Sequence, residues 1–230
     1  NANSKLVTIK TLVDFSATNL NLFPTAGSGG WQQFSGGDDA LASLSIDDFI
    51  GEDLGANKRT CVAALEEIDE ISMVMAPNMW SPNLQQALFS HCELLKDRFA
   101  ILDPKHGLSI EEVRTAREII DTKYAALYHP WLRVRNPREK KAVIIAPSGH
   151  VAGVYARVDV ERGVHKAPAN EVVRGIDLRQ GLEQDVTKRE QDMLNPKGIN
   201  AIRFFPGRGY RVWGARTLSS DSSWKYVNVR

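Results

Sequence analysis

The sequence LNPKGINAIRFFPGRGYRVWGARTL, residues 194–218, decides the fold. Ile199 to Phe205 and Tyr210 to Ala215 have the composition of two strands, and Pro206-Gly-Arg-Gly between them is a turn sequence. Glycine permits positive φ at such a turn, and proline fixes the backbone beside it. The stretch therefore predicts two strands joined by a tight turn, and it contains no set of paired catalytic groups.

The rest of the last third of the chain is also rich in glycine and proline. Its segments include APSGHVAGVYARVD (146–159), RGVHKAPAN (162–170) and WKYVNVR (224–230). Ser148 to Val158 predicts a helix of small residues, with Ser148 as its N-cap and with glycines that permit close approach to a sheet. A polar helix is expected over Glu183 to Met193, and a terminal strand of alternating type over Trp224 to Val229.

Upstream, helical and strand patterns alternate strictly. Strands are expected over Ile71 to Ala76, Phe99 to Leu102 and Tyr124 to Tyr128, and they are apolar without inside-outside alternation. Helices are expected over Arg59 to Ile68, from Ser81-Pro82, and from Ser109. The apolar stripe of the helix from Ser81-Pro82 is Leu84, Ala87, Leu88, His91, Leu94 and Leu95. The apolar stripe of the helix from Ser109 is Ile110, Val113, Ala116, Ile119 and Ile120. This pattern predicts an α/β fold in three layers, with a mostly parallel sheet covered by helices on both faces.

The beginning of the chain has a different composition. Leu6 to Val13 predicts a strand, and Asn19 to Asp39 is rich in Asn, Gly, Ser and Pro, as an exposed loop or linker would be. Ser45 then opens a capping-box-like start to a helix containing Phe49 and Ile50. We therefore predict two domains, 1–45 as a strand and Gly-rich loop and 46–230 as the α/β core.

Composition excludes several classes of protein. The 230 residues are 43% hydrophobic and 25% charged, as in an ordinary globular protein, and the net charge of +1 argues against nucleic-acid binding driven by bulk charge. No apolar run reaches the roughly 18 residues of a membrane helix, and no secretory signal is visible. Cys61 and Cys92 fall in helical patterns, so we expect free buried thiols in a reducing cytoplasm.

The sequence signals for a catalytic or binding site are weak. Ser148 and His150 invite an α/β serine hydrolase, but both stand at the start of one expected helix, and no Gly-x-Ser-x-Gly elbow is present. The loop Gly27 to Gly30 lacks the Lys-Ser/Thr ending of a nucleotide-binding P-loop. Adjacent His91 and Cys92 point in different directions on a helix, and the histidines expected to be isolated in turns are His106, His129 and His165. The sequence predicts no catalytic, cofactor or metal site.

The sequence contains two runs of like charge and one cluster of basic and aromatic residues, and each of them has two possible interpretations. The acidic run is Glu66, Glu67, Asp69 and Glu70, and the basic run is Arg133, Arg135, Arg138, Lys140 and Lys141. Each run is either solvated surface or a patch that meets another subunit. Arg208, Arg211 and Arg216 with Trp213 could bind nucleic acid, but we favour packing in the hairpin, with arginines paired to acids and Trp213 filling volume.

Several long sequence words in order give a specific resemblance. The chain resembles the tail sheath proteins of contractile bacteriophages, and equally the sheaths of tailocins and extracellular injection systems. The words are SGHVAG (148–153), RGVHKAPAN (162–170), LNP (194–196), GIN (198–200), FPGRG (205–209) and VWGART (212–217). Upstream they are RT (59–60), LEEIDE (65–70), HCE (91–93), KDRF (96–99) and YAALY (124–128).

The resemblance implies a non-catalytic core with a topology called subtilisin-like, an inserted domain, and N- and C-terminal arms. It implies a structural subunit, not an enzyme, that assembles with itself in six-fold rings or a helical sheath and contracts to drive a tail tube through a target envelope. Its partners would be the tube, baseplate and tail terminator proteins, with no nucleic acid or membrane, and it would assemble in the bacterial host cytoplasm into the tail of the virion or particle. We expect residues 1–45 to be a remnant of the inserted domain or a linker, and the tube-contacting C-terminal domain to be absent.

Overall fold

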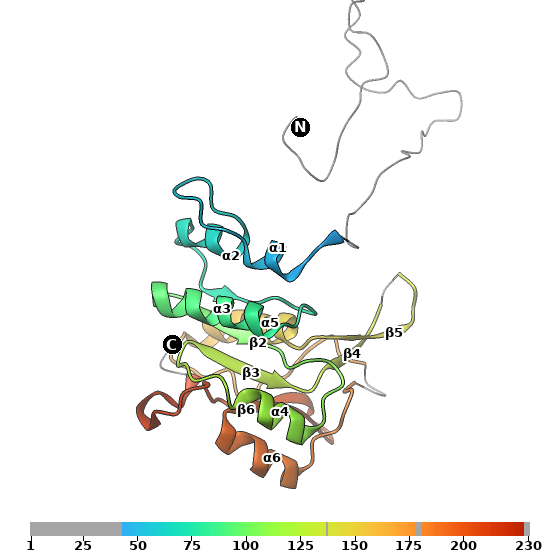
Figure 1. Ribbon diagram of the computed structural model, residues 1–230. Helices are drawn as coiled ribbons and strands as arrows, with labels where there is room; N and C mark the ends of the chain where they lie inside the picture. Colours follow the sequence, from blue (N-terminus) through green and yellow to red (C-terminus); the bar gives the residue numbers. More distant parts are fainter. Residues whose placement is uncertain (1–42, 137, 178–180, 228–230) are drawn as a thin grey trace, which may run out of the picture. The chain divides into compact units, whose positions relative to one another are not determined.

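The computed structural model describes residues 43–136, 138–177 and 181–227 (Figure 1). The chain divides into two units, 1–45 and 46–230, and every helix and strand given below belongs to the second. The strand expected over Leu6 to Val13, the loop Asn19 to Asp39 and the glycines 27–30 lie outside the described residues. The assignment of two domains therefore stays a prediction.

A five-stranded sheet in the order β1-β2-β3-β6-β7 forms the centre of the second unit. β1 (Met73–Val74), β2 (Phe99–Leu102), β3 (Ala125–His129) and β6 (Ile199–Phe205) are parallel, and β7 (Gly209–Trp213) is antiparallel to β6. Every residue of β2 and β3 is buried, as the unbroken apolar runs predict for strands covered on both faces. The expected strand pair with its Pro206-Gly-Arg-Gly turn is confirmed as β6 and β7.

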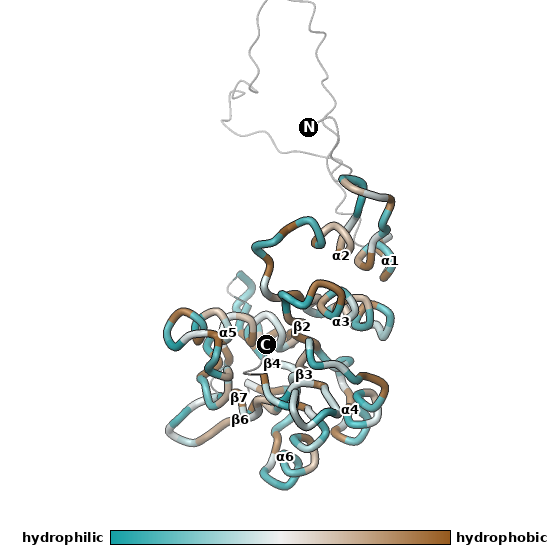
Figure 2. The backbone as a smooth tube through the Cα atoms, turned by 90° about the vertical axis from the view of Figure 1, so that its left-hand side faces the viewer, coloured by the Kyte–Doolittle hydropathy of each residue, from teal (hydrophilic) through white to brown (hydrophobic). Residues whose placement is uncertain are grey.

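Helices cover both faces of this sheet (Figure 2). One core contains Ala100, Leu102, Ala125 and Leu127 and packs under α3 (Pro82–Leu95), α4 (Ile110–Arg117) and α6 (Lys188–Leu194). The other core contains Phe99, Ile101, Ala126 and Tyr128 and packs under α5 (Ser148–Arg162). Because successive side chains of a strand point to opposite faces, the alternate residues of β2 and β3 fall into different cores. The mixed α/β fold in three layers is confirmed.

Helix starts follow the capping residues of the sequence. Ser109 and Glu112 form a reciprocal capping box at the start of α4, and Thr187 and Glu190 form another at α6. α3 begins with Pro82 in its first turn and ends at Lys96 in the left-handed conformation. The starts predicted at Ser81-Pro82 and Ser109 are confirmed. The polar helix expected over Glu183 to Met193 is shorter, since it begins only after its cap.

The segment before the sheet is less regular than its pattern predicts. The helix expected over Arg59 to Ile68 reduces to α2 (Cys61–Ala64) and the 3₁₀ turn η2 (Leu65–Glu67), and the strand expected over Ile71 to Ala76 reduces to the two residues of β1. Cys61 is exposed, so the prediction of a buried thiol holds for Cys92 alone. α1 (Ile46–Ile50) precedes this segment and packs its apolar residues against the first core.

Two predicted apolar stripes also extend too far. Leu94 is 65% exposed, because it lies on the outer side of the last turn of α3. Ile119 is 78% exposed, because α4 ends at Arg117 and the chain turns before reaching it.

The remaining described residues contain a second sheet of two antiparallel strands, β4 (Leu132–Arg135) and β5 (Ala142–Ile145).

The glycines of α5 are not used as predicted. A Cβ atom placed on Gly149 or Gly153 would meet nothing within 4 Å, so neither glycine faces the sheet. The close approach occurs at Gly214, where a Cβ atom would lie 2.5 Å from Oδ1 of Asn200.

At the end of the described chain, Ser222–Trp224 is a 3₁₀ turn (η4) and Tyr226 forms one isolated bridge with Arg216, in place of the expected start of a terminal strand.

Candidate functional site

Ser148 is an anchor for α5 and not an exposed nucleophile. Its side chain is fully buried, its hydroxyl donates to Oδ2 of Asp103 over 2.5 Å, and its backbone N–H donates to Oδ1 over 2.8 Å. Pro147, not Ser148, is the N-cap of the helix, which corrects the sequence interpretation. Burial raises the pKa of Asp103 to about 7, although both bonds from Ser148 oppose that rise. The pair ties the end of β2 to the start of α5.

His150 does not complete a catalytic pair with Ser148. Residues two apart on a helix do not face each other, and a Cβ atom on Gly175 would lie 3.3 Å from Nε2 of His150. Burial lowers the pKa of His150. Among the described strands, the parallel ones run β1, β2, β3, β6 across the sheet without reversing order, so these four strands form no switch point of the kind where open α/β sheets bind ligands.

The remaining histidines lie apart from one another. His91 is buried beside Arg98, with Nε2 3.3 Å from Nη1, and burial with the charge of Arg98 lowers its pKa. His106 is 2.9 Å from Glu183, and His165 is exposed. His129 ends β3 and is not in a turn; its ring nitrogens have no hydrogen-bond partner in the described structure, and burial lowers its pKa to about 4. No three metal-ligating side chains gather within the described ranges.

An open apolar groove of about 610 Å³ lies beside the edge strand β1; we call it the β1 groove. Its lining comes from α1, α2, η2, α3 and the segment around β1. The lining residues are twelve apolar side chains and one cysteine: Phe49, Cys61, Val62, Leu65, Ile71, Met73, Val74, Met75, Ala76, Pro77, Met79, Leu84 and Leu88. A groove with this lining suits an apolar partner surface more than a reactive small molecule.

Carboxylates follow and precede lining residues of the β1 groove in the sequence. Glu66, Glu67, Asp69 and Glu70, which we call the acidic rim, fall between the lining residues Leu65 and Ile71. From Glu52 to Glu70 the chain carries six carboxylates and two cations, a net charge of −4. The predicted acidic run is therefore a surface patch beside an apolar groove.

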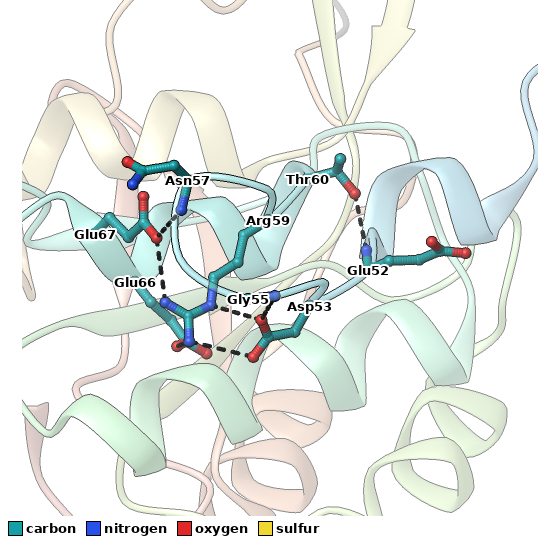
Figure 3. A network of polar contacts seen from close by, with 8 residues as sticks. All are labelled: Glu52, Asp53, Gly55, Asn57, Arg59, Thr60, Glu66 and Glu67. Carbon is teal, nitrogen blue, oxygen red and sulfur yellow. Dashed lines mark hydrogen bonds and ion pairs between the residues drawn. The ribbon is translucent and has the colours of Figure 1, made fainter.

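Arg59 holds part of this patch together (Figure 3). Its guanidinium lies 3.0 Å from Asp53, 3.6 Å from Glu66 and 3.3 Å from Glu67. The pKa of Asp53 is lowered, mainly by the hydrogen bond from the backbone N–H of Gly55 and then by the hydrogen bond and charge of Arg59. The side chains of Arg59 and Glu66 are 24% exposed and those of Asp53 and Glu67 52% and 37%, so water screens these pairs and each one contributes little to global stability. Asp69 and Glu70 are exposed and form no ion pair among the described residues.

Arg98 connects the acidic rim to the core. It is 3% exposed, and its Nη1 and Nη2 donate to the carbonyl oxygens of Leu65 and Ile68 over 2.8 and 3.2 Å. In a continuing α-helix the carbonyl of Leu65 would accept from the N–H of residue 69. Here it accepts from the N–H of Ile68 in the 3₁₀ turn over 3.3 Å and from Arg98. This contact explains why the helix predicted over Arg59 to Ile68 ends early.

The predicted basic run lies on the β4–β5 hairpin, which extends from the sheet in Figure 1. Residues 132–145 carry five cations and one carboxylate, a net charge of +4. Arg135, Arg138, Lys140 and Lys141 are exposed, and none pairs with a carboxylate of the described ranges. Ile144 beside them is 39% exposed.

The arginines of the β6–β7 hairpin serve structure, but not by the predicted pairing with acids. Arg211 donates to the carbonyl of Asn170 over 2.6 Å, and Arg208 to its side chain over 3.2 Å. Arg216 stacks over the ring of Tyr226 at 4.7 Å. Trp213 is 36% exposed and packs against Phe205, so it fills less interior volume than expected.

A family model described as phage tail sheath protein central domain matches residues 54–218. The chain belongs to the phage tail sheath protein family. The match includes the acidic rim, the β4–β5 hairpin, the whole five-stranded sheet and every lining residue of the β1 groove except Phe49. The family predicted from the sequence words is confirmed.

Curated sheath proteins also match more than half of the chain. The prophage major tail sheath protein of Pseudomonas aeruginosa is 31% identical over 150 residues, which are 62% of this chain and 38% of that protein. The tail sheath protein of Burkholderia phage BcepMu is 23% identical over 187 residues, 75% of this chain and 39% of that protein. The chain thus spans about two fifths of the length of these relatives.

Solved structures agree with this match. The sheath complex of an extracellular contractile injection system, PVC, in its contracted state is 35% identical with a TM-score of 0.62, covering 74% of this chain and 48% of that chain. The helical sheath of the anti-feeding prophage in its contracted state is 34% identical with a TM-score of 0.57, covering 72% of this chain and 44% of that chain.

The helices within the described ranges include none with the length and apolar character of a membrane span.

Proposed function

We propose that this chain is the core of a contractile sheath subunit, which polymerises around a tail tube and contracts to drive the tube through a target envelope. The observation that carries the proposal is the sheath-family match over residues 54–218, together with structural similarity to a contracted injection-system sheath. In such a machine the work comes from the difference in interface free energy between two packings of one subunit. That mechanism requires a rigid core and surfaces that can exchange partners.

The described structure supports both requirements. Two apolar cores, one on each face of a buried parallel sheet, suit a body that moves without deforming. The solvent-exposed ion pairs around Arg59 and the cations of the β4–β5 hairpin cost little to exchange. A subunit can therefore change neighbours while its core stays unchanged.

The partners in this proposal are other copies of the subunit, in six-fold rings or a helical sheath, the baseplate, the tail tube and the tail terminator. Similarity to sheath and baseplate structures supports the first two. The particle would be a phage tail, tailocin or injection system assembled in a bacterial host. In the family, neighbours also add strands to each other's sheets, a contact whose backbone hydrogen bonds can survive rearrangement.

We infer that the core has a subtilisin-like topology without catalysis. The parallel order β1-β2-β3-β6 with helices on both faces supports the topology. The buried hydroxyl of Ser148, already bonded to Asp103, argues against the alternative of a serine hydrolase. We also infer that residues 1–45 form a linker or part of an inserted domain, and that further sheath domains extend beyond the core.

The test compares oligomeric states. The full-length protein and this 230-residue chain are studied by light scattering and negative-stain microscopy, with and without tube protein. We expect tubes of stacked rings from the full-length protein, and monomers or weak oligomers from the chain. Monomers from both, even with tube protein, would contradict the proposal, and labelling of Ser148 by a fluorophosphonate would favour the hydrolase.

A further inference from the structure

We propose that the β1 groove is the docking site for the β4–β5 hairpin of a second copy of this chain. The inference rests on the proposed function, since it names one of the contacts by which sheath subunits would hold each other. The groove is apolar, the two surfaces carry opposite charges, and each has a strand edge without a strand partner in the described ranges.

The apolar parts fit in kind. The β1 groove presents methionine, leucine and phenylalanine side chains to solvent over a volume of about 610 Å³. The hairpin presents Ile144, 39% exposed, on a short strand whose neighbours Val143 and Ile145 are half-buried. An interface core of apolar side chains surrounded by a polar rim is the usual anatomy of protein association. The groove supplies the receiving half, and Ile144 supplies the inserted side chain.

The charges fit in sign and number. The segment from Glu52 to Glu70 has a net charge of −4, and the hairpin residues 132–145 have a net charge of +4. Within one chain, the exposed cations Arg135, Lys140 and Lys141 find no carboxylate among the described residues, and neither Asp69 nor Glu70 finds a cation within ion-pair distance. Complementary patches left unpaired in one subunit steer and register the approach of another.

The strand edges are also compatible. β1 ends the five-stranded sheet, and β5 pairs only with β4, so each leaves one edge without a strand partner in the described ranges. Exposed edges invite pairing with another chain, and charged residues such as Lys140 and Lys141 beside β5 limit which partner is accepted. The acidic rim is the partner that those lysines accept.

The contact joins two different surfaces, so it is heterologous and can continue from copy to copy. The hairpin and the groove lie close in one chain at their ends, because the backbone N–H of Ala146, after β5, donates to Asn78, between the groove residues Pro77 and Met79. The hairpin extends away from that point (Figure 1) and is free to reach a neighbour. Repetition of this contact would give an open-ended strand of subunits.

A cross-linking experiment tests the position of the contact. Cys61 is exposed and lines the β1 groove, whereas Cys92 is buried and burial raises its pKa to about 12. Ile144→Cys in the full-length protein should therefore form disulfide-linked pairs of copies through Cys61, identified by mass spectrometry of the joined peptides. The matched control is Val160→Cys, 89% exposed on α5, which should not join to Cys61. Equal joining by the control, or bridges that avoid Cys61, would overturn the proposal.

A charge exchange tests the chemistry. Lys140→Glu with Lys141→Glu, and separately Asp69→Lys with Glu70→Lys, should each weaken assembly about tenfold or more, because like charges then face each other. Combining all four changes should restore assembly. The control Lys188→Glu with Arg189→Glu makes the same charge change at the exposed start of α6 and should leave assembly intact.

The two failures can be told apart. If the full-length protein forms tubes that neither charge reversal weakens, this docking contact is wrong and the sheath function stands. If the hairpin thiol joins tube protein in place of a second copy, the occupant is wrong. If the full-length protein forms no tubes under any condition, the sheath function itself fails.

Discussion

The central strands and the segment from Ile46 to Glu70 differ in how deeply they are buried. β2 and β3 are buried at every residue, and their order depends on apolar packing against helices on both faces. The segment from Ile46 to Glu70 has no fully buried residue in α1, α2 or η2. Its apolar residues are only partly buried against the first core, and its polar contacts are the ion pairs around Arg59 and the bonds from the buried Arg98. We therefore expect the buried sheet and the partly exposed segment to respond differently to the loss of polar contacts.

The largest expected effect concerns His129, at the buried end of β3. Its folded pKa is about 4 against an ordinary value of 6.5, because burial disfavours the charged ring. Its contribution to stability is therefore present above pH 6.5, where the imidazole is neutral in both states, and is lost as pH falls towards 4, because only the unfolded chain then binds the proton. The loss over this range is about 3 kcal/mol.

His129→Leu should remove that loss, since leucine takes up no proton and leaves no unbonded ring nitrogen in the core. The measurement is the free energy of unfolding in urea between pH 7 and pH 4 for both proteins. Asp103, whose raised pKa makes its contribution largest at low pH and smaller as pH rises towards 7, remains in both proteins and cancels in the difference. An equal pH dependence of the free energy of unfolding in the two proteins would show that water reaches His129 at the end of β3.

A smaller effect is expected at the junction of the two regions. Arg98→Ala removes one of the two donors to the carbonyl of Leu65 and the side-chain donor to the carbonyl of Ile68. It also removes a buried guanidinium whose pKa Asp97 raises by a direct hydrogen bond. We expect a loss of about 2 kcal/mol, together with faster proteolysis between residues 65 and 72. Arg98→Lys is the informative comparison, because one ammonium cannot reproduce the forked geometry and should restore little. Proteolysis spread evenly over the sheet would contradict the division into two regions.

Sequence reasoning works best where a single physical effect dominates. Phe99 to Leu102 is predicted and found as a strand, because a short apolar run bounded by polar residues has few alternatives in a buried parallel sheet. Ser109 with Glu112 is predicted and found as a helix start, because a capping box is entirely local. These elements establish the fold class without any knowledge of tertiary contacts.

Sequence reasoning fails where a distant residue decides the outcome. The helical pattern of Arg59 to Ile68 is real, but Arg98, some thirty residues later, binds its carbonyls and ends the helix. Ser148 has the side chain of an N-cap, yet Asp103 from the end of β2 takes its hydroxyl and N–H. The β1 groove has no sequence signature of its own, and the acidic run beside it was the one visible signal.

The smallest effect on the whole molecule is expected from Arg59, in the exposed network of Figure 3. Arg59→Ala leaves Asp53, Glu66 and Glu67 without their shared cation, but all three face solvent and water replaces it. The midpoint of urea unfolding should therefore stay almost unchanged, while amide hydrogen exchange quickens between residues 52 and 67. Raising the salt concentration should produce the same local change in the unmodified protein, because salt screens exposed pairs. A cooperative loss of protection that includes β2 and β3 would instead mean that the network around Arg59 and the buried sheet unfold as one unit, which would contradict the division into two regions.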